Sequence, residues 1–284
     1  NIAGVAIAIA AGGPGAVLWM VFAAFLGMSS KFTECTLGQM YRTVDAEGRI
    51  SGGPMHYLEK GIKDLKLGPL GDMLGKGLAV LFALMCIGAS LGGGNMFQAN
   101  QAFAAVADVV PWVADKPWFF GITLAFAVGL VIVGGIKRIG AATSAIVPVM
   151  CGMYLLAGFW ILGVNIEAIP SAFQKIVDGA FTADGLKGGV IGVIVQGFQR
   201  ASFSNEAGVG SAAIAHSAAS TSEPVREGIV ALLEPFIDTI IVCTMTGLVV
   251  VVTGVYESGD TNGVLMTSQA FATVFPWFPI VLSV

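Results

Sequence analysis

The stretch SNEAGVGSA, residues 204–212, decides how this sequence can fold. It places one carboxylate, Glu206, and two glycines, Gly208 and Gly210, inside a long run that is otherwise poor in charge. Glycine removes the steric barrier to unwinding, so the pattern predicts a helix that is interrupted here. If the run crosses a membrane, unpaired backbone groups are costly, and the interruption must be buried in protein or line a wet cavity.

The composition predicts a membrane protein. The chain has 284 residues, of which 56% are hydrophobic and 11% charged, and its mean hydropathy is +0.84. A soluble domain carries about 25% charged residues. Strand alternation is absent, which favours helices, and spanning a bilayer takes about 20 residues of helix. Long apolar runs recur at 16–40, 78–107, 118–136, 139–166, 228–256 and 264–284.

A half-length helix at 1–11 and the interrupted segment around 204–212 complete the set. We therefore expect one all-α transmembrane domain over 1–284 with about eight membrane segments. The chain starts on an apolar helix at Asn1 and stops inside another at Val284, so we expect a fragment that begins within the first span and ends within the last. The net charge of −4 is spread over loops and points to no nucleic acid partner.

Lysine and arginine are distributed asymmetrically between alternate loops. The expected inner loop 41–77, with Lys31 counted at the membrane edge, holds most of them, whereas the expected outer loops hold only Lys116, Lys175 and Lys187. By the positive-inside rule this predicts a multi-pass protein of the cell inner (plasma) membrane, with 41–77 in the cytoplasm.

Two short segments echo each other. Residues 1–5 and 205–209 share Asn, Ala, Gly and Val at the same offsets. With the orientation above, the first segment runs outward and the second inward. Weak similarity between oppositely oriented broken helices is typical of an inverted-repeat transporter.

A broken membrane helix offers its ends to a guest. Its amide end favours an anion and its freed carbonyls favour a cation, so one break can bind a zwitterion together with a metal ion. Ser204 and Asn205 add neutral polar groups. Arg200 and Glu206 have two interpretations: they hold the break in shape or gate it, which we favour, or Glu206 titrates or coordinates a cation during transport.

Polar residues elsewhere in the apolar runs are weaker candidates. Gly92, Gly93 and Gly94 would let another helix approach closely, and an amide stripe follows at Asn95, Gln98, Asn100 and Gln101. For Asn100 and Gln101 a cavity wall and interhelical hydrogen bonding are equally good explanations. Glu234 and Asp238 share a helix face and are interpreted as lining an inner vestibule rather than as a cation relay. His56 and His216 are interpreted as packed residues.

Three long motifs resemble one known family. FSNEAGVGSAAIAHSAA at 203–219, NIAGVAIAIAAGGPGA at 1–16 and GGPMHYLEKG at 52–61 are similar to signature segments of the sodium:alanine symporters, also called alanine or glycine:cation symporters. The resemblance implies a LeuT-type five-plus-five inverted repeat with discontinuous helices. It also implies symport of a small amino acid, alanine or glycine, with sodium.

The resemblance also assigns residues. It implies that Asn1 lies beside the substrate and a sodium ion, that Gln98 contacts the amino acid and that Phe203 closes over its side chain. Apart from the co-transported sodium no cofactor is expected, and no catalytic motif lies at membrane depth, so we expect no enzyme. A proton-coupled amino acid carrier and, with less support, a passive channel remain alternatives.

Overall fold

The computed structural model describes residues 1–182, 189–259 and 263–283, so Lys187 of the expected outer loop lies outside the described residues. Apart from turns and loops, the described residues form helices and one short antiparallel hairpin of β1 (Thr43–Val44) and β2 (Ile50–Ser51). It forms two compact units. The first unit comprises Asn1–Trp19, Met96–Arg200 and Ile241–Val284; the second comprises Met20–Asn95 and Ala201–Ile240.

Several helices are apolar enough to cross a membrane, as the composition predicts. Within the described ranges, four are also long enough: Ala16–Met40, Gly68–Val109, Gly135–Val164 and Pro224–Thr253. Two shorter apolar helices span Ile2–Gly12 and Pro117–Ile132. This helical, apolar architecture fits an integral membrane protein, whereas the expected total of about eight segments stays a prediction.

The helices of the first unit come from three separate stretches of the chain. Its elements are α1 (Ile2–Gly12), the start of α2 (Ala16–Met40), α5 (Phe97–Val109), α6 (Pro111–Ala114), α7 (Pro117–Ile132), α8 (Gly135–Val164), η2 (Ile166–Ala168), α9 (Ile169–Phe181), most of α10 (Gly189–Asn205), α13 (Thr244–Thr253), η4 (Val255–Ser258), α14 (Gly263–Ala272) and α15 (Phe278–Ser283).

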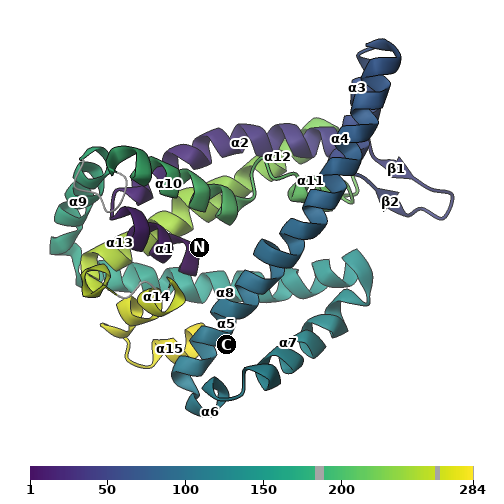
Figure 1. Cartoon of the computed structure of the whole chain (residues 1–284). Helices are drawn as coiled ribbons and strands as arrows, with labels where there is room; N and C mark the ends of the chain where they lie inside the picture. Colours follow the sequence, from purple (N-terminus) through teal and green to yellow (C-terminus); the bar gives the residue numbers. More distant parts are fainter. Residues whose placement is uncertain (183–188, 260–262, 284) are drawn as a thin grey trace. The chain divides into compact units, whose positions relative to one another are not determined.

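The core of the first unit forms where α1 packs on α13 and α14 (Figure 1). Val5 of α1, Val249 of α13 and Phe271 of α14 are fully buried. The contact between α1 and α14 needs glycine, because a Cβ at Gly263 would lie 2.6 Å from the Ala3 carbonyl oxygen. A turn follows α1, and Gly13 has a φ of 71° that favours glycine there.

The last apolar run departs from the prediction of one continuous span at 264–284. It forms two short helices, α14 and α15, separated by turns at residues 273–277. Pro276 favours a break here, since a proline lacks the amide hydrogen that a helix needs and disfavours helical backbone at the residue before it, and the stacked rings of Phe271 and Phe278 hold the two short helices together.

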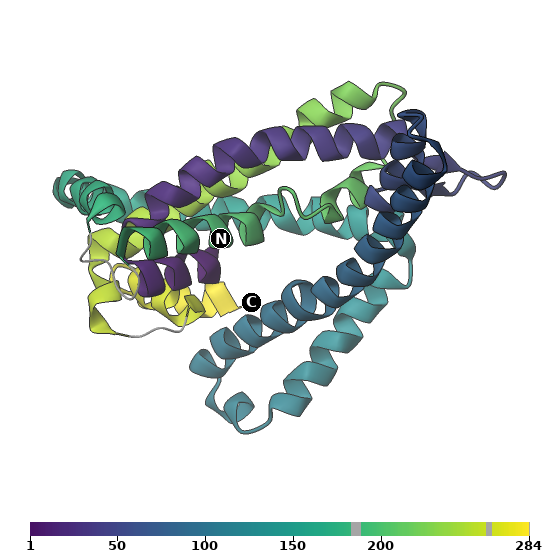
Figure 2. The same ribbon diagram turned by 45° about the horizontal axis from the view of Figure 1, so that its top comes forward.

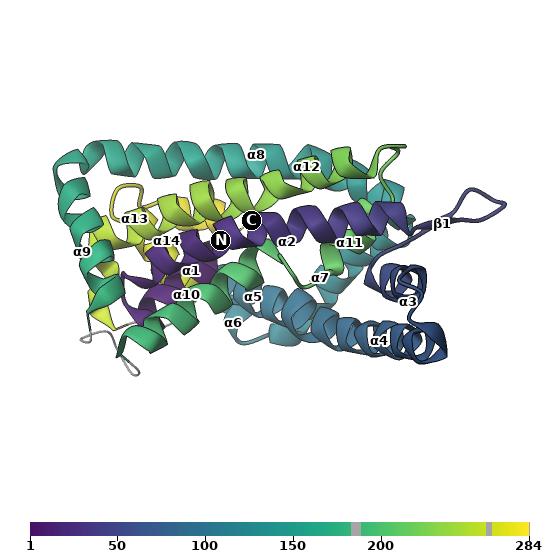
Figure 3. The same cartoon turned by 90° about the horizontal axis from the view of Figure 1, so that it is seen from above.

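The second unit is organised around α2. It contains the remainder of α2, the hairpin, α3 (Pro54–Asp64), α4 (Gly68–Ala89), η1 (Ser90–Met96), the end of α10, α11 (Ser211–His216), α12 (Pro224–Pro235) and most of η3 (Phe236–Cys243). Helix α12 runs beside α2 (Figure 2), and a Cβ at Gly228 would lie 2.1 Å from the Thr36 hydroxyl. Helices α3 and α4 also lie side by side (Figure 3).

The region 41–77, expected as an inner loop, contains the hairpin, α3 and the first turns of α4. At Pro235 the α-helix changes to the π-helical turns of η3, which begin at the next residue. A second π-helical segment, η1, contains the glycines at 92–94. π-Helical turns inside α-helices are frequent at functional sites.

Candidate functional site

The interruption lies where the sequence predicts it. Helix α10 ends at Asn205 and α11 begins at Ser211. Between them Glu206, Gly208 and Gly210 have φ values of 53°, 78° and 86°. This left-handed backbone suits glycine but is uncommon for glutamate, and such residues cluster at binding sites and switches.

The opposite ends of the interruption are held by side chains of one helix, α2. Lys31 Nζ donates to the carbonyl oxygen of Asn205, the last residue of α10, at 2.7 Å. Glu34 Oε2 accepts a hydrogen bond from the amide of Gly210, the N-cap of α11, at 3.1 Å. A cation thus meets the carbonyl end and an anion meets the amide end, which is the stabilising arrangement for both helix dipoles.

Lys31 is buried within the second unit. Its side chain is 2% exposed and its ammonium lies 2.5 Å from a carboxylate oxygen of Glu234 on α12. Burial of a lysine requires such a partner, because an unpaired charge loses its hydration without compensation. Lys31 and Glu34 were missed as site residues, although their spacing of three inside an apolar helix was a visible signal.

Ser204 and Asn205 belong to a hydrogen-bond network with η3. The Ser204 hydroxyl donates to Asp238 Oδ2 at 2.7 Å, and the Thr239 hydroxyl donates to the same oxygen at 3.0 Å. Asn205 Nδ2 donates to Thr239 Oγ1 at 3.0 Å, and Asn205 Oδ1 accepts from the Ala207 amide at 3.1 Å. Asp238, interpreted from the sequence as part of a vestibule, therefore contacts the candidate site directly.

Phe203 packs against the glycines of η1. A Cβ added at Gly93 would lie 3.0 Å from the Phe203 ring, so only glycine admits the ring at this distance. The sequence predicts that another helix approaches this glycine run, whereas the structure shows one close contact, the ring of Phe203 against Gly93, and nothing within 4 Å of a Cβ at Gly92. A π-helical segment and an interrupted helix therefore meet within the same unit.

Glu206 forms a hydrogen bond across the interruption. Its carboxylate accepts a hydrogen bond from the Ser211 hydroxyl at 2.5 Å, across the interruption. Arg200 belongs to the first unit and Glu206 to the second, so the structure does not test whether the two hold the break in shape together. The cation that contacts the interruption within the second unit is Lys31. A structural or gating function of Arg200 and Glu206 stays a prediction.

The remaining predicted site residues, Asn1 and Gln98, lie in the first unit. Asn1 Oδ1 accepts from the Cys243 thiol at 3.7 Å, and next to it the Thr267 hydroxyl donates to the Ile2 carbonyl at 2.9 Å. Gln98 lies on α5 and is exposed. A single site that joins these residues with Phe203, Ser204 and Asn205 would draw on both units and stays a prediction.

Other polar residues make structural contacts. Gln101 Oε1 accepts from the amide of Val264 at 3.1 Å, so the interhelical interpretation holds for this side chain. His216 Nδ1 lies 2.5 Å from Glu227, as expected of a packed histidine. His56 lies on α3, outside the spans, and burial together with the nearby charge of Lys60 holds the pKa of its imidazole below the ordinary value.

The chain resembles known transporters over its whole length. The model of the sodium:alanine symporter family matches residues 1–284. The sodium/alanine symporter AgcS of Methanococcus maripaludis is 43% identical over 288 residues, covering 100% of this chain and 61% of the relative. The probable sodium/glutamine symporter GlnT of Bacillus subtilis is 34% identical over 274 residues, covering 96% and 54%.

The name of a further relative includes a proton as well as sodium. The putative sodium/proton-dependent alanine carrier protein YrbD of Bacillus subtilis is 37% identical over 270 residues, covering 95% of this chain and 53% of the relative. The chain thus spans between 53% and 61% of the length of these three relatives. The match to the family model extends over every motif on which the resemblance was based, and the chain belongs to the sodium:alanine symporter family.

Proposed function

We propose that the full-length protein is a secondary active symporter that carries a small neutral amino acid, alanine or glycine, together with sodium by alternating access. Membership of a symporter family makes the chain part of a transporter rather than an enzyme. The observation that carries the proposal is the interruption at residues 206–210, held by Lys31 and Glu34, inside an apolar protein of this family.

The proposed architecture is the LeuT-type five-plus-five inverted repeat in the cell inner membrane, crossed several times by the chain. It is supported by the break that follows Asn205 and by the short α1 helix that follows Asn1. Half-helices with opposite orientation let two repeats rock around one central site, which is how such folds give alternating access.

The proposed substrate site is formed by Asn1, Gln98, Phe203, Ser204 and Asn205. Amide side chains and helix-end backbone groups would bind the carboxylate and ammonium of the amino acid, and Phe203 would cover its small side chain. In this proposal Asn1 also contributes to the sodium site. Names of relatives include alanine and glutamine carriers, so competition between the two amino acids is the direct test of substrate size.

Asp238 is the residue that best supports coupling to a cation. Its Oδ2 already accepts two hydroxyl hydrogen bonds, from Ser204 and Thr239, which orients the carboxylate next to the proposed substrate site. Ionisable residues inside a membrane face cavities and mark ion pathways. Sodium is the proposed partner of this carboxylate, and a proton is the second candidate because one relative is named as a sodium/proton-dependent carrier.

The experiment is uptake of labelled alanine by the full-length protein in proteoliposomes, with sodium replaced by choline. We expect sodium to improve the apparent affinity about 5–150-fold, the range of usual coupling free energies. Asp238→Asn should lower this sodium effect, whereas Glu59→Gln, a charge removal on the exposed face of α3, should not. Equal uptake in sodium and choline would reject sodium coupling, and an imposed proton gradient would then test the second candidate.

A further inference from the structure

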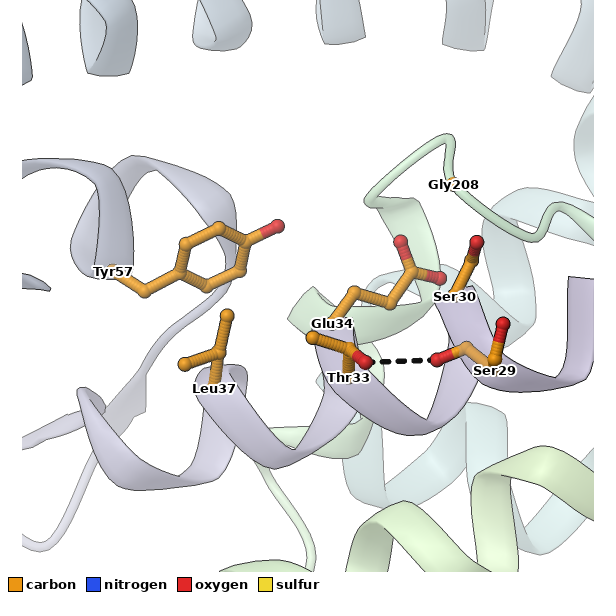
Figure 4. A pocket seen from close by; sticks show the side chains of 7 residues that line it. All are labelled: Ser29, Ser30, Thr33, Glu34, Leu37, Tyr57 and Gly208. Atoms are coloured by element: carbon orange, nitrogen blue, oxygen red, sulfur yellow. Dashed lines mark hydrogen bonds between the residues drawn. The ribbon is translucent and has the colours of Figure 1, made fainter.

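A polar cavity of about 370 Å³ lies against the middle of α2, within the second unit (Figure 4). Its lining residues come from α2, from α3 and from the interruption. They are Ser29, Ser30, Thr33, Glu34, Leu37, Tyr57 and Gly208. The function proposed above does not use this cavity.

The polar side chains that line the cavity all end in oxygen, and Leu37 adds one apolar side chain. The Ser29 hydroxyl donates its hydrogen to the Leu26 carbonyl at 2.7 Å, and the Thr33 hydroxyl donates to the Ser29 carbonyl at 2.8 Å (Figure 4 shows the second bond). Because these hydrogens are donated to backbone carbonyls, the two hydroxyl oxygens can offer only their lone pairs to a bound ligand. Oxygen ligands are what hard metal cations prefer.

Glu34 supplies the charge. Its side chain is only 6% exposed, and the carboxylate points between Ser30 and Gly208 in the cavity view (Figure 4). One oxygen, Oε2, accepts the Gly210 amide, while Oε1 makes no hydrogen bond to any described residue. A buried carboxylate oxygen without a partner is costly, and a bound cation would compensate it.

The surrounding charge is also unbalanced. The segments 20–40, 201–210 and 228–240 carry four carboxylates, those of Glu34, Glu206, Glu234 and Asp238, against the single ammonium of Lys31. Lys31 is committed to Glu234 and to the Asn205 carbonyl. Excess negative charge at membrane depth favours recruitment of a positive ion.

Tyr57 completes the polar lining from α3. Burial, and after it the negative charge of Glu34, raises the pKa of Tyr57 to about 12. The phenol therefore stays protonated at neutral pH and offers a neutral oxygen. One carboxylate among neutral hydroxyls suits a monovalent cation, whereas calcium sites gather several carboxylates.

We infer that this cavity is a binding site for a monovalent metal cation of the size of sodium, coordinated by Glu34 and the hydroxyls of α2. The site is distinct from the substrate site proposed around Asn205, and its occupancy does not depend on symport. Because Glu34 also accepts a hydrogen bond from the Gly210 amide, a cation here would stabilise the conformation in which α2 is bonded to the interruption.

The test is direct binding of radiolabelled sodium to the purified full-length protein in detergent. It is carried out without any amino acid and with choline maintaining ionic strength. Glu34→Gln keeps an acceptor for the Gly210 amide and removes the charge. We expect it to weaken one class of sodium binding about tenfold or more, since a contact with a charged group commonly contributes that much.

Ser30→Ala serves as the second variant because no hydrogen bond within the protein depends on that hydroxyl in the described residues. We expect a smaller loss, about twofold to tenfold, for one neutral ligand. Glu59→Gln is the matched control, and its sodium affinity should equal that of the unchanged protein. If Glu34→Gln fails to purify as a folded protein, Ser30→Ala decides the question.

Unchanged sodium affinity in the folded variants would overturn the inference. So would a loss of alanine affinity with sodium affinity intact, because the cavity would then accept the substrate's ammonium group. Failure of the proposed symport gives a different pattern, in which choline supports uptake as well as sodium does. The two proposals can therefore fail separately.

Discussion

Two interruptions of the apolar runs are built differently. The break at residues 206–210 follows Asn205 and is held by ionisable side chains of α2, Lys31 at the carbonyl end and Glu34 at the amide end. The break at residues 273–277 is closed by its own backbone and by rings. There the amide of Phe275 donates to the Phe271 carbonyl at 3.0 Å, and Phe271 stacks on Phe278 with centroids 4.8 Å apart.

The difference separates two reasons for breaking a membrane helix. At the break that contains Pro276, local backbone hydrogen bonds and stacked rings hold the two short helices together. The run 264–284 has no charged residue that could bind a ligand. At the break of glycines, buried charges from another helix hold the two ends, and Asp238 lies beside it. Holding ends with charges is costly in a membrane, and such residues are retained where they serve transport.

The largest effect is expected at the aromatic break. Phe271→Ala removes a fully buried ring that also stacks on Tyr154, and should destabilise the protein by about 3–5 kcal/mol. The unfolding midpoint in detergent measures this. Apparent sodium affinity of the surviving folded fraction should not change. A large change in sodium affinity would contradict the view that this break is structural.

Lys31→Met tests the charged break. It leaves the Asn205 carbonyl and Glu234 without their cation, and should cost about 2–4 kcal/mol, below the full cost of breaking a buried pair because Glu234 is 42% exposed. Uptake should be lost as well. The double variant Lys31→Met with Glu234→Leu should regain much of the stability without regaining uptake. Full stability of the single variant would show that Lys31 does not hold the break.

Two glycines of the same break should respond unequally. Gly208 and Gly210 both have positive φ. A Cβ at Gly210 would lie 2.7 Å from Pro54 Cγ and 2.8 Å from the Phe82 ring, whereas a Cβ at Gly208 would have no neighbouring atom within 4 Å. Gly210→Ala should therefore cost about 2–3 kcal/mol and Gly208→Ala about 1 kcal/mol. Comparison of their unfolding midpoints separates steric contact from backbone strain, and equal values would remove the steric explanation.

The smallest effect is expected from Pro276→Ala. The proline is exposed, and the stacked rings around it keep the break closed after its removal. We expect a change below about 1 kcal/mol, as for most exposed substitutions. A cost as large as that of Gly210→Ala would mean that both breaks depend on local backbone restraints, and the contrast between them would disappear.

The local parts of the fold were predictable. Hydropathy marked α2, α8 and the span Pro224–Thr253, and the glycines marked the break after Asn205, because chain length in a bilayer and backbone freedom are properties of neighbouring residues. The same reasoning overlooked Pro276 as a breaker in the last run. The apolar composition of 264–284 suggested one continuous helix, although Pro276 in that run is a known helix breaker.

The partners of the charged residues were not predictable. Lys31 contacts the Asn205 carbonyl at the break from 174 positions away along the chain, and no local pattern indicates that contact. Asp238 reaches Ser204 across 34 positions.

By itself, then, the sequence determined a helical membrane protein, the place where one helix breaks and the family. Only the tertiary structure decided which side chains meet the ends of that break and where a polar cavity opens beside Glu34. The physical reason is that a break follows from local backbone preferences. The stabilisation of a buried charge depends on whichever distant group the fold brings within hydrogen-bonding distance.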